Sequence, residues 1–252
     1  MSELCSVEAV DDGVSVMTLN DPQRRNALSL ELTAQMTAAL DTLETDGTTR
    51  ALVVTGAGRA FCAGADLSQL GASREQGLRS IYEGFLRVAT SPLVTIAAVN
   101  GAAVGAGMNL ALACDVRIAA RSARFDTRFM QLGIGPGGGH TWWLQRLTGP
   151  QTTAAMVLCS EILDAEDAQR VGLVWSTVDD DELLVGARRI ASNAASAPAE
   201  LLRRTKATLA ATATGSHAEA LETELVTQVW SMDQPAFAER LAALQSQIRR
   251  SD

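Results

Sequence analysis

Two segments, residues 52–67 and 93–115, constrain the fold of this chain most strongly. Each begins as an apolar run rich in β-branched residues, which predicts a buried strand, and each then passes into glycine and alanine. Side chains this small let a ligand lie against the main chain, so that backbone N–H groups can recognise it. Two strand ends that each deliver such N–H groups can hold one oxyanion from two sides.

Composition narrows the class of protein. The chain has 252 residues, of which 47% are hydrophobic, enough for one sizeable core or a core with a small added lobe. A net charge of −8, from 21 basic and 29 acidic residues, argues against a nucleic-acid surface. The four cysteines show no CxxC spacing, so we expect free thiols and no metal site. With no secretion signal and no long uncharged apolar run, we expect a cytoplasmic protein without a membrane segment.

Strands and helices alternate in the first part of the chain, which favours parallel crossover units of the α/β class. The turn signal Asp12-Gly13 predicts an opening hairpin, and Ser29 is a predicted N-cap. The expected strands are 4–10, 14–19, 50–55, 93–99, 116–119 and 173–178. The expected helices up to Pro150 are one of about four turns after Ser29, 78–89 and 106–113.

After Pro150 the pattern becomes mainly helical, with predicted helices at 151–159, 165–171, 181–195, 199–213, 217–232 and 235–249. We therefore divide the chain into an α/β core, residues 1–197, and a C-terminal helical lobe, residues 198–252. Leu221, Leu225, Val229 and Trp230 recur at helical spacing in this lobe and predict a surface that needs a partner.

Six segments in this order resemble the crotonase, or enoyl-CoA hydratase/isomerase, superfamily. They are DPQRRNALS (21–29), FCAGADL (61–67), NGAAVGAG (100–107), CDVRIAARSARF (114–125), LGIGPGGG (132–139) and AEDAQRVGLV (165–174). The resemblance implies a spiral of repeated ββα units with a C-terminal helical trimerisation lobe. It also implies a homotrimer or a dimer of trimers.

The same resemblance implies that the ligand is an acyl-CoA thioester, with coenzyme A as part of the substrate and no separate cofactor. The implied oxyanion donors are the backbone N–H groups of Ala65 and Ala106. The residues implied to contact coenzyme A or its thioester are Arg25, Ala27, Ala63, Gly64, Ala65, Asp66 and Ala106. Asp66 has an equally good structural interpretation as a helix N-cap. A dinucleotide site is a weaker interpretation of the glycines at 101–107, because their spacing is not GxGxxG.

The positions at which a two-glutamate hydratase of this superfamily carries its acid and base fall on Asn109 and Phe129. A third acidic position, used by some dienoyl isomerases and dehalogenases, falls on Gly137. Asn109 can hold a water molecule but cannot accept its proton at neutral pH, and Phe129 can do neither. Ordinary hydration by paired glutamates is therefore not expected.

Three residues near these positions are candidate replacements. His140 stands at a predicted helix start, where an imidazolium is disfavoured, so a neutral His140 could act as a base or a hydrogen-bond donor; a structural role is the alternative. Asp126 would share a face with Phe129 if that stretch is one helical turn, or it pairs with a neighbouring arginine. Glu83 lies on the helix expected to wall the acyl site, or simply on its solvated face.

Two functions follow from these features. The first is an enoyl-CoA hydratase/isomerase-type enzyme, a lyase or an isomerase, that stabilises a thioester enolate and has replaced the usual glutamates. The second is an acyl-CoA-binding protein without chemistry, which Asn109 and Phe129 favour. The sequence leaves the reaction open among hydration, isomerisation, hydrolysis and none.

Overall fold

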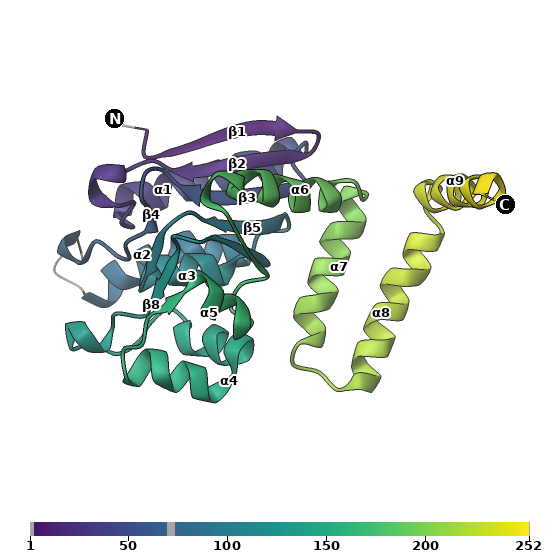
Figure 1. Cartoon of the computed structure of the whole chain (residues 1–252). Coiled ribbons are helices and arrows are strands. Elements are labelled where there is room, and N and C mark those ends of the chain that lie inside the picture. The colour runs from purple at the N-terminus through teal and green to yellow at the C-terminus, as the bar shows by residue number, and fades with distance from the viewer. Residues whose placement is uncertain (1–2, 70–73, 252) are drawn as a thin grey trace. The chain divides into compact units, whose positions relative to one another are not determined.

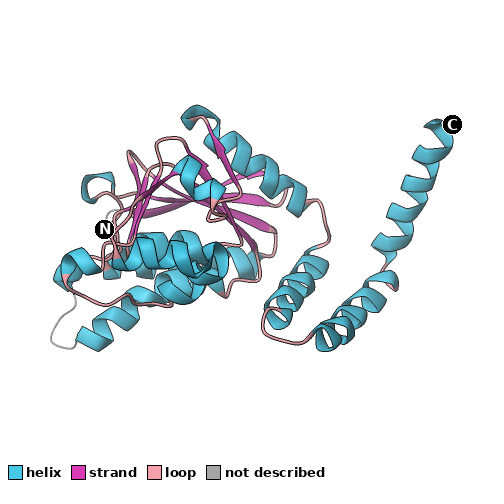
Figure 2. Cartoon of the chain, turned by 60° about the horizontal axis from the view of Figure 1, so that its bottom comes forward, coloured by secondary structure: helices cyan, strands magenta, loops and turns pink. Residues whose placement is uncertain are grey.

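The structure, a computed structural model, describes residues 3–69 and 74–251 (Figure 1). Internal contacts divide the chain into two units, Met1–Ala195 and Ser196–Asp252. All the strands of the described residues lie in the first unit, and the second unit consists of helices and their connections (Figure 2).

A six-stranded sheet forms the centre of the first unit. Its order is β1-β2-β3-β5-β7-β10, and the pairs are parallel except β1–β2. The strands are β1 (Cys5–Asp11), β2 (Val14–Leu19), β3 (Ala51–Gly56), β5 (Val94–Val99), β7 (Val116–Ala120) and β10 (Ser176–Val178). The predicted hairpin is confirmed: Gly13 has a φ of 72° in the tight turn that joins β1 to β2.

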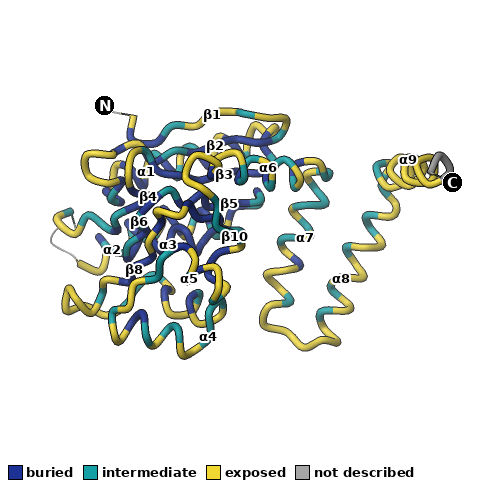
Figure 3. Tube along the Cα trace, in the orientation of Figure 1, coloured by how far each residue is buried: buried dark blue, intermediate teal, exposed yellow. Residues whose placement is uncertain are grey.

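The inner strands β2, β3, β5 and β7 are buried on both faces, so they are mainly apolar at successive positions rather than at alternate ones. The helices of this unit are α1 (Leu30–Asp46), α2 (Arg74–Ala89), α3 (Ala106–Ala113), α4 (His140–Leu158), α5 (Ala165–Arg170) and α6 (Leu183–Ala195). In β3, Leu52 and Val54 belong to the larger core with residues of α1, α2 and α3, whereas Ala51 and Val53 pack with residues of α6. Figure 3 shows the buried residues gathered in this unit.

Helix α1 begins as the sequence predicts. The Ser29 hydroxyl accepts a hydrogen bond from the Leu32 N–H at 3.1 Å, which satisfies one of the free donors of the first turn. Leu32, Met36 and Leu40 form its buried face, and Gly47 ends it in the left-handed conformation with a φ of 68°.

A second, four-stranded sheet was not predicted. Its order is β4-β6-β8-β9, with β4 (Ala60–Cys62), β6 (Ala102–Val104) and β8 (Arg124–Asp126) parallel and β9 (Leu163–Asp164) antiparallel. Strands of two or three residues are too short to show an alternating pattern. This sheet matters for function because the small-residue loops begin at the carboxyl ends of β4 and β6.

Some expected boundaries differ from the structure. Helix α2 begins at Arg74 rather than at residue 78. The helix starts expected at His140 and after Pro150 are both present, because Gly149, with a φ of 77° and a ψ of 173°, interrupts α4 just before Pro150. The strand expected over 173–178 is only Ser176–Val178, because the N–H groups of Leu173 and Val174 both donate to the Ala168 carbonyl and close the end of α5.

The second unit consists of α7 (Ala199–Thr212), α8 (His217–Met232) and α9 (Pro235–Ser251). Helix α8 opens with a capping box between Ser216 and Glu219. The Arg204 guanidinium of α7 lies 4.2 Å from the centre of the Trp230 ring of α8. Within residues 3–69 and 74–251, no helix combines the length and apolar character needed to cross a membrane.

Candidate active site

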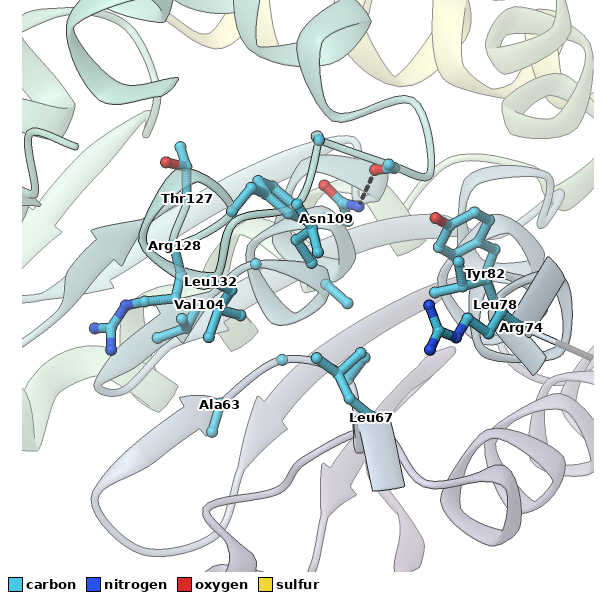
Figure 4. A pocket seen from close by; sticks show the side chains of 18 residues that line it. Ala63, Leu67, Arg74, Leu78, Tyr82, Val104, Asn109, Thr127, Arg128 and Leu132 are labelled. Carbon is cyan, nitrogen blue, oxygen red and sulfur yellow. Dashed lines mark hydrogen bonds between the residues drawn. The ribbon is translucent and has the colours of Figure 1, made fainter. Parts of the chain in front are cut away.

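A cavity of about 560 Å³ lies where the loops after β4 and β6 meet helix α2 and the segment that follows β8 (Figure 4). This volume is within the usual range for small-molecule sites. Its lining is mostly apolar and consists of Ala63, Gly64, Ala65, Leu67, Arg74, Leu78, Tyr82, Val104, Gly105, Ala106, Asn109, Thr127, Arg128, Phe129, Leu132, Ile134, Gly135 and Gly137.

The first predicted N–H donor, that of Ala65, is directed by a parallel bridge. The Leu28 N–H donates to the Gly64 carbonyl at 2.7 Å, and the Asp66 N–H donates to the Leu28 carbonyl at 2.9 Å. Because the residues on either side of Ala65 make these bonds, the N–H of Ala65 itself points away from Leu28. Ala65 lines the cavity, so this N–H is available to a ligand there.

The second predicted donor, the N–H of Ala106, is the first of helix α3. Gly105 precedes it with a φ of 51°, and the Gly105 N–H donates to the Asp126 carbonyl at 2.9 Å. The first N–H groups of a helix have no intrahelical acceptor and carry the positive end of the helix dipole. The N–H of Ala106 therefore suits a negatively charged oxygen.

Small residues bring the two donors to one gap. A Cβ atom added at Gly64, which has a φ of 105°, would lie 2.9 Å from the Val104 carbonyl oxygen and 3.9 Å from the Ala106 nitrogen. A Cβ added at Gly107 would lie 2.1 Å from the Cys62 carbonyl oxygen. Only glycine permits either approach. The structure thus brings together the two segments that the sequence singled out.

Asn109 lines the same cavity from α3, and both ends of its amide are already engaged. Its Nδ2 donates to the Gly137 carbonyl at 3.0 Å, the dashed line in Figure 4. Its Oδ1 lies 2.7 Å from His140 Nδ1. Because Oδ1 can only accept, the His140 proton is on Nδ1. With its oxygen and one N–H engaged in this way, the Asn109 amide cannot act as a base.

His140 is buried behind Asn109 and is not among the residues that line the cavity. Its Nε2 is buried and has no hydrogen-bond partner among the described residues. Burial lowers the pKa of its imidazole from 6.5 to about 4, so the ring is neutral at physiological pH. The predicted neutral state has this physical basis, but the structure places His140 against Asn109 rather than against a ligand.

No aspartate, glutamate or histidine is among the lining residues that the structure describes. Phe129 lies on the cavity wall, and its ring meets the His140 ring edge to face at a centroid distance of 5.0 Å. Gly137 carries no side chain and is approached by Tyr82 instead. The three positions that the resemblance associates with acids thus present an amide, a phenyl ring and bare backbone.

The structure contradicts the helical placement of Asp126. The residue ends strand β8, so it does not share a helical turn with Phe129. It is 3% exposed and absent from the cavity lining, and its carboxylate accepts from Arg128 Nε at 2.8 Å. This ion pair raises the pKa of the Arg128 guanidinium. Asp126 therefore has the structural role that was the alternative.

Glu83 also lies away from the cavity. It is an exposed residue of α2 and borders a separate groove on the outer side of that helix, together with Arg79 and Leu86. Residues one position apart on a helix point in directions about 100° apart, so Glu83 diverges from the cavity wall that Tyr82 forms. The solvated helix face is the correct interpretation.

The segment implied to contact coenzyme A runs beside the first small-residue loop. The Ala63 N–H donates to the Arg25 carbonyl at 2.9 Å, and Arg25 itself is exposed with a φ of 54°. Ala27 is half-buried. Asp66 accepts from the Ser68 N–H at 3.2 Å and thereby caps the following 3₁₀ turn, as in the structural alternative.

Helix α2, which was expected to wall the acyl site, lines the cavity through residues that were not singled out from the sequence. They are Arg74, Leu78 and Tyr82. Their spacing of four residues places all three on one face of that helix, and this periodicity is the signal from which the wall could have been found.

A fold of this type, with two backbone donors at a mainly apolar cavity, defines a site suited to an anionic carbonyl oxygen. A family model for enoyl-CoA hydratase/isomerase matches residues 9–243. The chain belongs to this family, the crotonase superfamily, and is an enoyl-CoA hydratase/isomerase-like enzyme.

Particular relatives extend the comparison. The chain is 51% identical over 247 residues to a probable enoyl-CoA hydratase, echA14, of Mycobacterium tuberculosis, covering 94% of this chain and 96% of that one. It is 40% identical over 200 residues, 75% of each chain, to a 1,2-epoxyphenylacetyl-CoA isomerase of Escherichia coli. The crystal structure of an enoyl-CoA hydratase from Bacillus anthracis matches with a TM-score of 0.92 at 32% identity, over 97% of this chain and 96% of the other. The crotonase-like α/β fold expected from the sequence is confirmed.

Proposed function

We propose that this protein binds an acyl-CoA thioester and stabilises its enolate between the N–H groups of Ala65 and Ala106. The observation that carries the proposal is the approach of these two donors to one gap at the cavity. Two fixed N–H groups favour the charged enolate oxygen over the neutral carbonyl, and one such donor is worth roughly 10²–10³ in rate.

We further propose that the usual glutamates are replaced, and that paired-carboxylate hydration is not the main reaction. The support is the pairing of Asn109 with His140 and Gly137, together with the phenyl ring at 129. A neutral site of this kind suits a step in which the substrate gains or loses a proton at carbon, as in isomerisation, more than the deprotonation of water.

A second function has an observation in its favour. The absence of any carboxylate or imidazole among the described lining residues is what an acyl-CoA-binding protein without chemistry would show. The intact pair of backbone donors favours the enzyme, because binding alone does not require stabilisation of an oxyanion.

The remaining assignments are also proposals. Arg25, Ala27, Ala63, Gly64 and Asp66 would hold the coenzyme A portion, since they form the edge beside the Ala65 donor. The apolar residues of α8, of which Leu221 is 52% exposed and Val229 51% exposed, support assembly into a homotrimer or a dimer of trimers. Free cysteines support a cytoplasmic location.

Turnover on a panel of enoyl-CoA and saturated acyl-CoA thioesters, with binding measured in parallel by calorimetry, tests the proposal. We expect binding of the thioesters, none of NAD, and turnover of at least one thioester. Binding without turnover across the panel would favour the non-catalytic function. Binding of NAD without binding of any thioester would refute both.

A further inference from the structure

Among the cavity-lining residues that the structure describes, a single side chain is suited to exchange a proton with carbon. An enolate that becomes a thioester again must receive a proton at its α-carbon. The described lining residues with exchangeable side-chain protons are Arg74, Tyr82, Asn109, Thr127 and Arg128. An arginine or an amide does not lose a proton under these conditions. The Thr127 hydroxyl is committed to the Met156 carbonyl at 2.9 Å. Tyr82 remains.

The Tyr82 ring is held on the wall by its neighbours. It lies 5.5 Å from the Phe85 ring, measured between centroids, and Phe85 in turn meets Trp143 at 6.2 Å. Phe85 is fully buried, so this contact fixes the ring against the core. Tyr82 is half-buried, and within residues 3–69 and 74–251 its hydroxyl has no hydrogen-bond partner.

The hydroxyl occupies space that the missing side chain at 137 leaves open. A Cβ added at Gly137 would lie 2.2 Å from the Tyr82 oxygen, too close for both groups to remain in place. The Gly137 carbonyl accepts the Asn109 amide on its other side, and Figure 4 shows the Tyr82 hydroxyl directed toward this hydrogen bond. The hydroxyl thus lies at the cavity beside the Asn109 amide.

We propose that Tyr82 is the catalytic proton donor to the α-carbon of the enolate, an inference that rests on the proposed function. The O–H bond of Tyr82 breaks, and the electron pair of the enolate double bond forms the new C–H bond. The thioester carbonyl is restored at the oxyanion donors, and the phenolate then takes a proton from water. Tyr82 also borders the outer groove of α2, so solvent lies close to the ring. In the reverse direction the phenolate removes the same proton.

Burial raises the pKa of the Tyr82 phenol above its ordinary value, so the group is mostly protonated at neutral pH and can donate to an enolate. Removal of an α-proton from a thioester uses the small phenolate fraction, so exchange that depends on Tyr82 should become faster as the pH rises. Tyr82 is the only tyrosine in the chain, and the tyrosinate absorbance therefore reports its ionisation directly.

The test is exchange of the α-protons of butyryl-CoA in deuterated water, followed by NMR, with the dissociation constant of the same ligand measured by calorimetry. In Tyr82→Phe we expect exchange to fall roughly 10²–10⁴-fold, the range for loss of a general acid or base, with binding unchanged. In Gly137→Ala the hydroxyl is retained but displaced, and exchange should fall as well. The matched control is Gly186→Ala in helix α6, where the nearest atom to the new Cβ is 3.9 Å away.

The possible outcomes distinguish a failure of the Tyr82 assignment from a failure of the proposed function. If the wild type and Tyr82→Phe exchange at the same rate, the assignment of Tyr82 is wrong while the proposed function stands. If the wild type binds thioesters but neither exchanges nor turns over any of them, the proposed function is wrong and the assignment of Tyr82 with it. Should Tyr82→Phe fail to fold, an unchanged rate in Gly137→Ala would by itself overturn the assignment.

Discussion

His140 is expected to stay neutral in the folded protein well below the pH at which an exposed histidine takes up a proton. Burial lowers its pKa from 6.5 to about 4. Its Nδ1–H is donated to Asn109, and Nε2 faces no partner that could stabilise a second proton. Unfolding exposes the ring, so between these pH values the unfolded chain binds a proton that the folded chain does not.

This difference in proton uptake sets the sign and the size of the change in the free energy of unfolding with pH. A histidine whose pKa is lowered by folding leaves stability unaffected above pH 6.5 and reduces it as the pH falls, because protonation favours the unfolded chain. At 1.36 kcal/mol per pKa unit, the loss is about 2 kcal/mol at pH 5 and about 3 kcal/mol by pH 4. His140 is 1% exposed, so solvent screening does not reduce this figure.

Two measurements check the prediction. The chain has two histidines, so side-chain NMR resolves them, and a His217→Ala variant identifies the second signal. The His140 signal should remain that of a neutral Nδ1–H ring down to about pH 5. In urea unfolding, His140→Asn keeps a donor near Nδ1 but does not titrate, so its deficit relative to the wild type should shrink by about 3 kcal/mol between pH 7 and pH 4. Titration of His140 near pH 6.5, or a constant deficit, would refute the reasoning.

The other predictions concern the site and the second unit. Ala65→Pro removes an oxyanion donor and should cost about 2.7–4 kcal/mol of transition-state stabilisation. Wild-type turnover in a folded variant would show that the Ala65 N–H is not an oxyanion donor. Asn109→Glu with Phe129→Glu should raise hydration of crotonyl-CoA more than either change alone, measured as loss of enoyl absorbance; efficient hydration by the unaltered chain would contradict this. Glu83→Gln should leave kcat/KM unchanged, and a large loss of kcat/KM would show that Glu83 contributes to catalysis. Leu225→Glu should lower the mass measured by light scattering, because α8 is proposed to form the interface between protomers. A wild-type chain that is already monomeric would show that α8 has no such interface.

The double substitution illustrates why the gain in hydration should be partial. In the wild type the Asn109 amide donates to the Gly137 carbonyl at 3.0 Å. A glutamate there cannot donate, so the half-buried Gly137 carbonyl would lose its donor. A fully buried unsatisfied group costs about 1–3 kcal/mol, and a partly solvated one costs less. The new carboxylate also lies beside His140, whose pKa it would raise by favouring the imidazolium. The groups around residue 109 therefore stabilise an amide side chain there better than a carboxylate.

The sequence predicted those parts of the fold that have strong local signals. The hairpin at Gly13, the cap at Ser29 and helix Ala106–Ala113 are each set by residues within one element. The second sheet was missed because its strands have two or three residues, and their pairing is decided by the six-stranded sheet above them rather than by their own pattern.

The same division holds for the site. The small-residue loops could be recognised because glycine at close backbone contacts leaves a mark in the sequence, as Gly64 and Gly107 do. The hydrogen bond between Asn109 and His140, by contrast, has no recognisable pattern in the sequence. The two residues are 31 positions apart, and they meet only because the left-handed Gly138 and Gly139 turn the chain before helix α4. A polar contact of this kind depends on three-dimensional placement, so the sequence left His140 open between a catalytic and a structural role. The structure shows it bonded to Asn109, which lines the cavity.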